Sequence, residues 1–340
     1  MRLFIALGVG LISFSSAFAA SQADRETCDK ASDPDAGIKA CTNIIDSYDK
    51  GYNRAIAYNI RGNDYWRKGE YDRAIADFDQ AIRLDPQDAA SYYNRGVAYD
   101  DNDEYDRAIA DFDQAIRLDP QDAAAYNNRG FAYDDNGEYD RAIADYDQAI
   151  RLDPKYADAY TNRGVAYDDK GEYDRAIADY DQAIRLNPKS ATAHYNRGTA
   201  YNGKGEYDRA IADFDQTIRL DPKYAAAYNN RAIAYGRKGE YDRAIADYDQ
   251  AIRLDPKDAY LYKDRAWAYF KAGKAAQGLP DAEKSLELRP NDAEILDTRG
   301  IIFEELGRRE EAIADFRRAL SKDPNMQSVK DALKRLGVEP

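Results

Sequence analysis

The sequence predicts an all-α protein, a solenoid of stacked helical hairpins. A nearly identical phrase recurs every 34 residues, its apolar and small residues follow helical spacing, and glycine or Asp-Pro separates successive segments. The phrase EYDRAIADYDQAIRLDP runs from Glu138 to Pro154, and close copies begin at Glu70, Glu104, Glu172, Glu206 and Glu240. A fixed period of this length is typical of repeat arrays rather than of separate globular domains.

The first twenty residues, MRLFIALGVGLISFSSAFAA, have the pattern of an export signal. Arg2 supplies a short positive region, residues 3–12 are apolar, and Ala17-Phe18-Ala19 fits a small-x-small cleavage site. The apolar run is shorter than the roughly 20 residues that a spanning helix needs. We therefore expect residues 1–19 to be a signal peptide and the mature chain to be periplasmic or secreted, without membrane insertion. The alternative is an N-terminal anchor that stays attached.

The net charge of the 340-residue chain narrows the classes of partner. It is −14, and removing residues 1–19 with their one basic residue would make it −15. So acidic a protein repels nucleic acid and anionic lipid. We therefore expect no nucleic-acid partner, and we favour cationic peptides, basic protein faces or metal ions.

Residues 20–54 read as a degenerate N-terminal hairpin. Cys28 and Cys41 are thirteen residues apart, as are Tyr65 and Phe78, an aromatic pair in the following unit. In an oxidising compartment the cysteines would close a disulfide, contributing about 3 kcal/mol in the chain-entropy model. A metal site or a reactive thiol is the alternative.

The regular array covers residues 55–326 as eight units. In the unit from Ala123 to Tyr156, each half places apolar or small residues on one helical stripe. Gly137 suits a helix stop, and Asp153-Pro154 closes the hairpin. Because one hairpin cannot cover its own apolar face, neighbouring units must stack. The expected units are 55–88, 89–122, 123–156, 157–190, 191–224, 225–258, 259–292 and 293–326.

These residues resemble the tetratricopeptide repeat family. The resemblance covers residues 55–326 and rests on Tyr126, Gly130, Tyr133, Gly137, Tyr139, Ala142, Tyr146, Ala149 and Pro154 and their equivalents. It implies a right-handed superhelix whose concave groove, lined mainly by first helices, binds peptides or proteins. One consistent departure is an arginine, such as Arg129, where the family usually has an aliphatic residue.

That arginine needs a partner if it is even partly buried. Each unit also has an aspartate sixteen residues later, such as Asp145, and an antiparallel hairpin places the two slots opposite each other. We predict a ladder of Arg–Asp pairs inside the solenoid. The alternative is that each aspartate pairs on the surface with the arginine four residues before it, such as Arg141.

The last units depart from the repeat pattern. Gly278 replaces the usual alanine and Pro280 falls early in a second helix, so we expect the least stable interface of the array near residues 273–286. Residues 327–340 read as a C-terminal capping helix and tail, with an amphipathic helix over residues 327–336.

The sequence does not predict an enzyme, a cofactor or a metal centre. His194, the single histidine, occupies a slot that is tyrosine in other units, which favours a packed aromatic substitute over a catalytic role. No glycine-rich phosphate loop or nucleophile turn is visible. We therefore expect no catalytic residues.

The variable face of the first helices predicts the ligand groove. A row of asparagines can pair with peptide groups, or else supports the helices. Aspartate pairs in units two to four can accept a basic ligand, hold Ca²⁺ or remain solvated, although a calcium loop needs a terminal glutamate that is missing. Units six and seven become basic and aromatic. The predicted groove comprises Asn94, Asn128, Asn162, Asn196, Asn230, Asp100, Asp101, Asp134, Asp135, Asp168, Asp169, Val97, Phe131, Val165, Ile233, Trp267, Lys263 and Lys271.

Together these features predict an exported, non-enzymatic scaffold that binds a peptide or protein segment in a preformed groove, with a basic segment among the candidates. The alternative is a module that binds cations or a cell-envelope polymer without a defined peptide partner.

Overall fold

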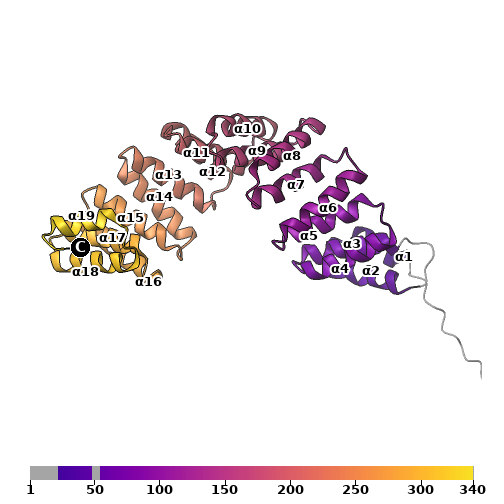
Figure 1. The fold of residues 1–340 in the computed structure, drawn as a ribbon, viewed down its shortest axis with the longest axis horizontal. Helices are drawn as coiled ribbons and strands as arrows, with labels where there is room; N and C mark the ends of the chain where they lie inside the picture. Colours follow the sequence, from indigo (N-terminus) through magenta and orange to yellow (C-terminus); the bar gives the residue numbers. More distant parts are fainter. Residues whose placement is uncertain (1–21, 48–53, 340) are drawn as a thin grey trace, which may run out of the picture. The chain divides into compact units, whose positions relative to one another are not determined.

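The computed structural model describes residues 22–47 and 54–339, and every regular element in these ranges is an α-helix (Figure 1). Consecutive helices pair as antiparallel hairpins, so the predicted all-α repeat architecture is confirmed. The expected signal peptide lies outside the described residues. Among the described residues, no helix combines the length and the apolar character that crossing a membrane requires.

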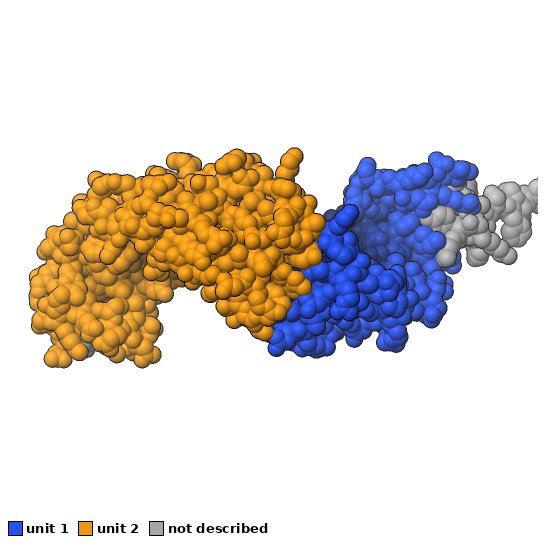
Figure 2. Space-filling view, turned by 90° about the horizontal axis from the view of Figure 1, so that it is seen from above, with its two compact units in different colours: residues 1–159 blue, residues 160–340 orange. Residues whose placement is uncertain are grey.

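The chain forms two compact units, residues 1–159 and 160–340, which Figure 2 colours separately. The helices of unit 1 are α1 Gln22–Lys30, α2 Pro34–Asp46, α3 Arg54–Arg67, α4 Tyr71–Leu84, α5 Ala89–Asp100, α6 Tyr105–Leu118, α7 Ala123–Asp135 and α8 Tyr139–Leu152. Helix α9, Ala157–Asp169, contains the boundary between the units. Unit 2 continues with α10 Tyr173–Leu186, α11 Ala191–Gly203, α12 Tyr207–Leu220, α13 Ala225–Arg237, α14 Tyr241–Leu254, α15 Ala259–Lys271, α16 Ala275–Leu288, α17 Ala293–Glu305, α18 Arg309–Lys322 and α19 Gln327–Arg335.

Local chemistry sets the helix ends. The Asp122 carboxylate accepts hydrogen bonds from the backbone N–H groups of Ala124 and Ala125, at 2.9 and 3.3 Å, and so caps the N-terminus of α7. After α7, Gly137 adopts a φ of +77°, which costs glycine little. The chain therefore reverses within a few residues, and α8 packs back against α7.

Small residues let the two helices of a hairpin approach closely. A Cβ atom added to Gly96 would lie 2.8 Å from Cε1 of Phe112, and one added to Gly130 would lie 2.8 Å from Cε1 of Tyr146. Both aromatic side chains are fully buried. Each hairpin therefore has a core in which a ring from the second helix fills the space above a glycine of the first.

We expect Tyr146→Phe to stabilise unit 1. The Tyr146 hydroxyl is buried and has no hydrogen-bond partner among the described residues, whereas the same slot holds Phe78 and Phe112 in the two preceding hairpins. Removing an unsatisfied buried hydroxyl should raise the free energy of unfolding by about 1 kcal/mol. Chemical denaturation followed by circular dichroism measures this change.

Tyr133→Phe is the matched control, because the Tyr133 hydroxyl accepts a hydrogen bond from Arg141. This variant should lose about 1 kcal/mol instead. Equal losses in the two variants would show that the Tyr146 hydroxyl is satisfied.

The predicted ladder of Arg–Asp pairs is confirmed. In each of the eight regular hairpins, from α3/α4 to α17/α18, Nε and Nη2 of the arginine donate to the two carboxylate oxygens of the aspartate sixteen residues later, over 2.6–2.8 Å. In the second hairpin, 18% of the Arg95 side chain and 7% of the Asp111 side chain are exposed. Such bidentate pairs are stronger than point-charge contacts and fix the geometry of both side chains.

The ladder also links successive hairpins, which the sequence analysis missed. Nη1 of Arg95 donates to Asp79 of the preceding hairpin over 2.5 Å, and Nη1 of Arg129 donates to Asp113 in the same way. The signal was the second aspartate of the IADFD and IADYD phrase. The alternative surface partner is absent in this hairpin, because Arg141 pairs with Glu138 instead.

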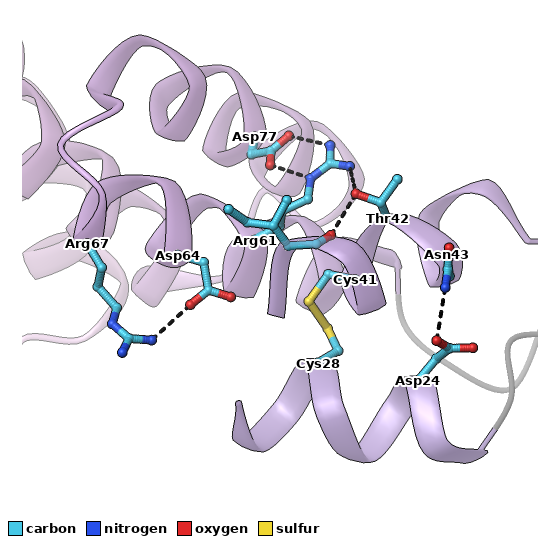
Figure 3. Close-up of a disulfide and its surroundings, with 10 residues drawn as sticks. Asp24, Cys28, Cys41, Thr42, Asn43, Arg61, Asp64, Arg67 and Asp77 are labelled. Atoms are coloured by element: carbon cyan, nitrogen blue, oxygen red, sulfur yellow. Dashed lines mark hydrogen bonds and ion pairs between the residues drawn. A yellow bond between two sulfur atoms is a disulfide. The ribbon is translucent and has the colours of Figure 1, made fainter. Parts of the chain in front are cut away.

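A disulfide joins α1 to α2 in the N-terminal hairpin (Figure 3). Cys28 and Cys41 are both buried, with their Cα atoms 4.9 Å apart. Figure 3 also shows how this hairpin meets the array, where Nη1 of Arg61 donates to the Thr42 hydroxyl over 2.9 Å. The disulfide thus fixes the helix pair that covers the first regular repeat.

The last hairpins keep the close helix approach by different residues. A Cβ atom on Gly278 would lie 2.7 Å from the Ala266 carbonyl oxygen, so glycine here faces alanine, the reverse of the usual arrangement. Pro280 lies inside α16, and the lower stability expected near residues 273–286 stays a prediction. Beyond α18, helix α19 buries Val329, Ala332 and Leu333 against the last hairpin.

Candidate functional site

The residues predicted to line a groove occur at repeated positions of the first helix of each hairpin, from its middle to its C-terminal end. Helix α5 and its C-cap carry Asn94, Val97, Asp100 and Asp101; α7 carries Asn128, Phe131, Asp134 and Asp135; α9 carries Asn162, Val165, Asp168 and Asp169; α11 carries Asn196; α13 carries Asn230 and Ile233; and α15 carries Lys263, Trp267 and Lys271.

The asparagine row connects neighbouring first helices. Three of its amides donate from Nδ2 to a residue of the preceding repeat: Asn94 to Asn59 Oδ1 over 2.9 Å, Asn128 to the Tyr93 hydroxyl over 2.9 Å, and Asn230 to the Tyr195 hydroxyl over 3.0 Å. The structural interpretation therefore holds for these donors. Contact between the asparagine carbonyl oxygens and a ligand backbone stays a prediction.

Unit 1 brings several carboxylates together at the ends of α5 and α7. Burial, together with the charges of Asp135, Asp101 and Asp103, raises the pKa of Asp100 to about 7. Burial also raises the pKa of Asp135, and the Asp103 charge adds to the effect. Asp101 accepts a hydrogen bond from Trp66 Nε1 over 2.5 Å. Repulsion among the carboxylates adds to the effect of burial, and a bound cation would relieve that repulsion.

We expect Asp100→Asn to change how stability depends on pH. The folded-state pKa of Asp100 lies above its unfolded value of 3.8, so the folded state retains a proton that the unfolded state has lost. Stability should therefore fall as pH rises from about 4 to about 7. Since the cluster is partly exposed, we take about 1–2 kcal/mol of this loss as the contribution of Asp100.

Urea unfolding at pH 5 and pH 8 tests this expectation. The stability difference between the two pH values should shrink by that amount in Asp100→Asn and stay unchanged in Asp72→Asn, a variant of an exposed aspartate of the same unit. An unchanged difference in Asp100→Asn would contradict the expectation.

The predicted charged residues of unit 2 differ in their surroundings: Asp168 lies on α9, whereas Lys263 and Lys271 lie on α15. Burial and the charge of Asp169 raise the pKa of Asp168 to about 6. On α15, Lys263 Nζ lies 3.1 Å from Glu294 and 3.5 Å from Asp264, so its charge is already paired. By contrast, Lys271 Nζ lies over the exposed Trp267 ring, 5.8 Å from its centroid.

A cavity of about 540 Å³ lies between α13, α14 and α15. Of the predicted residues, Ile233, Trp267 and Lys271 line it, while the sequence analysis missed the contributions of Tyr241 and Tyr248 on α14. The sequence signal for this cavity is Gly236, a glycine at the repeat position that Asp100 occupies on α5.

The structure also places the remaining candidates for chemistry. His194 is buried, and its Nδ1 lies 3.2 Å from Oδ1 of Asp213, the carboxylate that Arg197 also binds. The histidine thus packs within the ladder. Within residues 22–47 and 54–339, no group of three or more His, Cys, Asp or Glu side chains is arranged to hold a metal ion.

Tetratricopeptide repeat models match the chain over residues 61–123, 98–157, 127–191, 161–212, 195–259 and 293–326. The chain belongs to the tetratricopeptide repeat family. Proteins of this family are generally scaffolds for protein interactions rather than enzymes, because solenoid surfaces offer extended sites for binding. No curated protein matches the chain in sequence.

Solved structures agree with this assignment. A tetratricopeptide repeat protein from Parabacteroides merdae is 27% identical, with a TM-score of 0.56, over 73% of this chain and 98% of that one. A chain of the APC/C hetero-tetramer Cut9–Hcn1 is 20% identical, with a TM-score of 0.60, over 85% of this tetratricopeptide repeat protein and 57% of that chain. The pilus biogenesis factor PilW is 22% identical, with a TM-score of 0.57, over 62% and 98% of the respective chains. The last two show a shared fold alone.

Proposed function

We propose that this protein is an exported scaffold that binds a basic peptide segment of a partner protein at the carboxylate cluster of α5 and α7. The observation that supports the proposal most is the gathering of four carboxylates, because burial and, after it, the charges of Asp135, Asp101 and Asp103 raise the pKa of Asp100 to about 7. Trp66 lies beside Asp101 and is 37% exposed, so lysine or arginine side chains would meet both carboxylates and an aromatic face.

Binding of a fluorescent lysine-rich peptide to the full chain tests this function. Asp100→Asn/Asp135→Asn should weaken binding about tenfold, because losing two partly desolvated ion pairs costs on the order of 1.4 kcal/mol. The matched control is Asp72→Asn/Asp106→Asn, which removes two exposed carboxylates of the same unit. The control should change affinity less than about twofold. Equal losses in both variants would leave only a general charge effect and would reject the site.

Export is the second part of the proposal. It is supported by the order of three features in residues 1–19: a positive charge, an apolar run and a small-x-small cleavage pattern. Mass spectrometry of the protein recovered from a bacterial periplasm or culture medium should give a chain that begins at Ala20. Recovery of the uncleaved chain from the cytoplasm would reject this part.

The alternative of a cation-binding module has less support. Ca²⁺ prefers six to eight oxygen ligands, and the described residues contain no group arranged to hold a metal. No structural observation favours a cell-envelope polymer over a peptide.

A further inference from the structure

The cavity between α13, α14 and α15 differs from the carboxylate cluster of unit 1 in shape and charge. Its volume is about 540 Å³, enough for a large side chain and adjoining backbone. Ile233, Trp267 and the rings of Tyr241 and Tyr248 supply apolar surface. Trp267 is 40% exposed and packs against Phe270 with the ring centroids 5.1 Å apart, so part of its surface remains accessible to a ligand.

Gly236 opens this cavity. The equivalent slot holds Asp100 on α5, Asp168 on α9 and Asn202 on α11, whereas a Cβ atom on Gly236 would meet no atom within 4 Å. Adjacent first helices therefore leave a space here that a side chain occupies in other repeats. Tyr248, which is 5% exposed, lines the same cavity.

Two cations that line the cavity, Arg237 and Lys271, form no ion pair among the described residues. Nearby cations behave differently, since Lys238 pairs with Asp208 and Lys274 pairs with Asp242. In a chain with a net charge of −14, two unpaired cations beside exposed aromatic surface form a local site for an anion.

We infer that this cavity binds an acidic peptide segment by inserting one bulky apolar or aromatic side chain, with flanking carboxylates on Arg237 and Lys271. The inference rests on the proposed scaffold function and adds a second site of opposite charge preference. An inserted ring would contact Trp267 and Tyr248, and the arginine fork suits a carboxylate.

Asp264 favours a peptide over a polyanion such as polyphosphate. Its carboxylate lines the cavity, and 30% of its side chain is exposed. A carboxylate can accept a hydrogen bond from a peptide N–H, but it repels a ligand whose every unit is anionic. A peptide with alternating acidic and apolar residues satisfies the cations, the aromatic walls and Asp264 together.

The test uses full-length protein and a fluorescent peptide of glutamates flanking one tryptophan, with fluorescence anisotropy as the readout. Arg237→Gln/Lys271→Gln should weaken binding at least about tenfold, the effect of losing two ion pairs at a partly enclosed site. The matched control, Lys223→Gln/Lys257→Gln, removes two exposed turn cations of the same unit and should change affinity less than about twofold.

Gly236→Asp provides an independent variant. It places at this slot the residue that three other repeats carry, in space that is open, so the fold should be retained. It should abolish binding by filling the cavity and adding a negative charge, while circular dichroism and thermal unfolding stay unchanged. Replacing the peptide tryptophan by alanine should weaken binding comparably to the cation variant.

The remaining outcomes discriminate between explanations. Unchanged affinity in both the cation and Gly236→Asp variants, or polyphosphate displacing the peptide at equal charge concentration, would overturn the inference. Self-association that these variants abolish, without peptide binding, would identify a second copy as the occupant and also overturn it. If the lysine-rich peptide binds and the acidic peptide does not, this inference fails alone; if neither binds, the proposed function fails as well.

Discussion

Asp111→Ala should lower the free energy of unfolding of unit 1 by about 3–5 kcal/mol, the cost of removing one partner from a buried ion pair. The substitution leaves the Arg95 guanidinium inside the hairpin without the bidentate acceptor that now lies 2.7 Å away. Urea denaturation of the full chain, with the unit 1 transition followed separately from that of unit 2, measures the effect.

Asp79→Ala is the matched control for this prediction. Asp79 binds the same arginine, but 44% of its side chain is exposed, compared with 7% for Asp111. Its removal should cost less than about 1 kcal/mol, the range measured for exposed pairs. Comparable losses for the two variants would mean that burial does not determine the strength of the ladder.

Phe112→Ala should have an effect of similar size, about 3–5 kcal/mol, because it leaves a cavity in a packed core. Phe112 is fully buried, contacts the Tyr93 ring at a centroid distance of 5.9 Å and fills the space above Gly96. Little collapse into that cavity is possible, since the helices already approach closely. The measurement is again the unfolding transition of unit 1.

Phe131→Ala is the control of the same chemistry in the same unit. Phe131 is 40% exposed and lies on the face predicted to meet a ligand. Its truncation should cost less than about 1 kcal/mol. If this loss matched that of Phe112→Ala, Phe131 would have to be part of a core rather than of an accessible surface.

The sequence predicted the hairpins and the ladder pairs within each hairpin because both follow from a strict repeat. Because the spacing is identical in eight units, a pair predicted for one arginine and the aspartate sixteen residues later applies to Arg61 as well as to Arg299. The hydrogen bonds from ladder arginines to the preceding hairpin were not predicted, because the 34-residue period does not determine which neighbouring hairpin a side chain contacts. Asp79 and Asp113 look like solvent-facing residues in the sequence.

The candidate site was less predictable, because it depends on departures from the repeat. Asn94 and Asn230 suggested ligand contacts, but their amide donors bond to the preceding repeat. The cavity arises from an absent side chain at Gly236, which a search for chemically active residues overlooks. Whether Arg237 and Lys271 are paired depends on three-dimensional neighbours that spacing alone does not supply.

Arg61, the first arginine of the ladder, differs from the internal ones in a way that bears on how such a chain grows by gene duplication. Where Arg95 reaches back to an aspartate of the preceding hairpin, Arg61 reaches back to Thr42 of the N-terminal hairpin. An internal repeat copied within unit 1 carries both the donor and the acceptor that its new neighbours require. The N-terminal hairpin offers a neutral hydroxyl instead, so it can end the array but cannot replace one of its internal members.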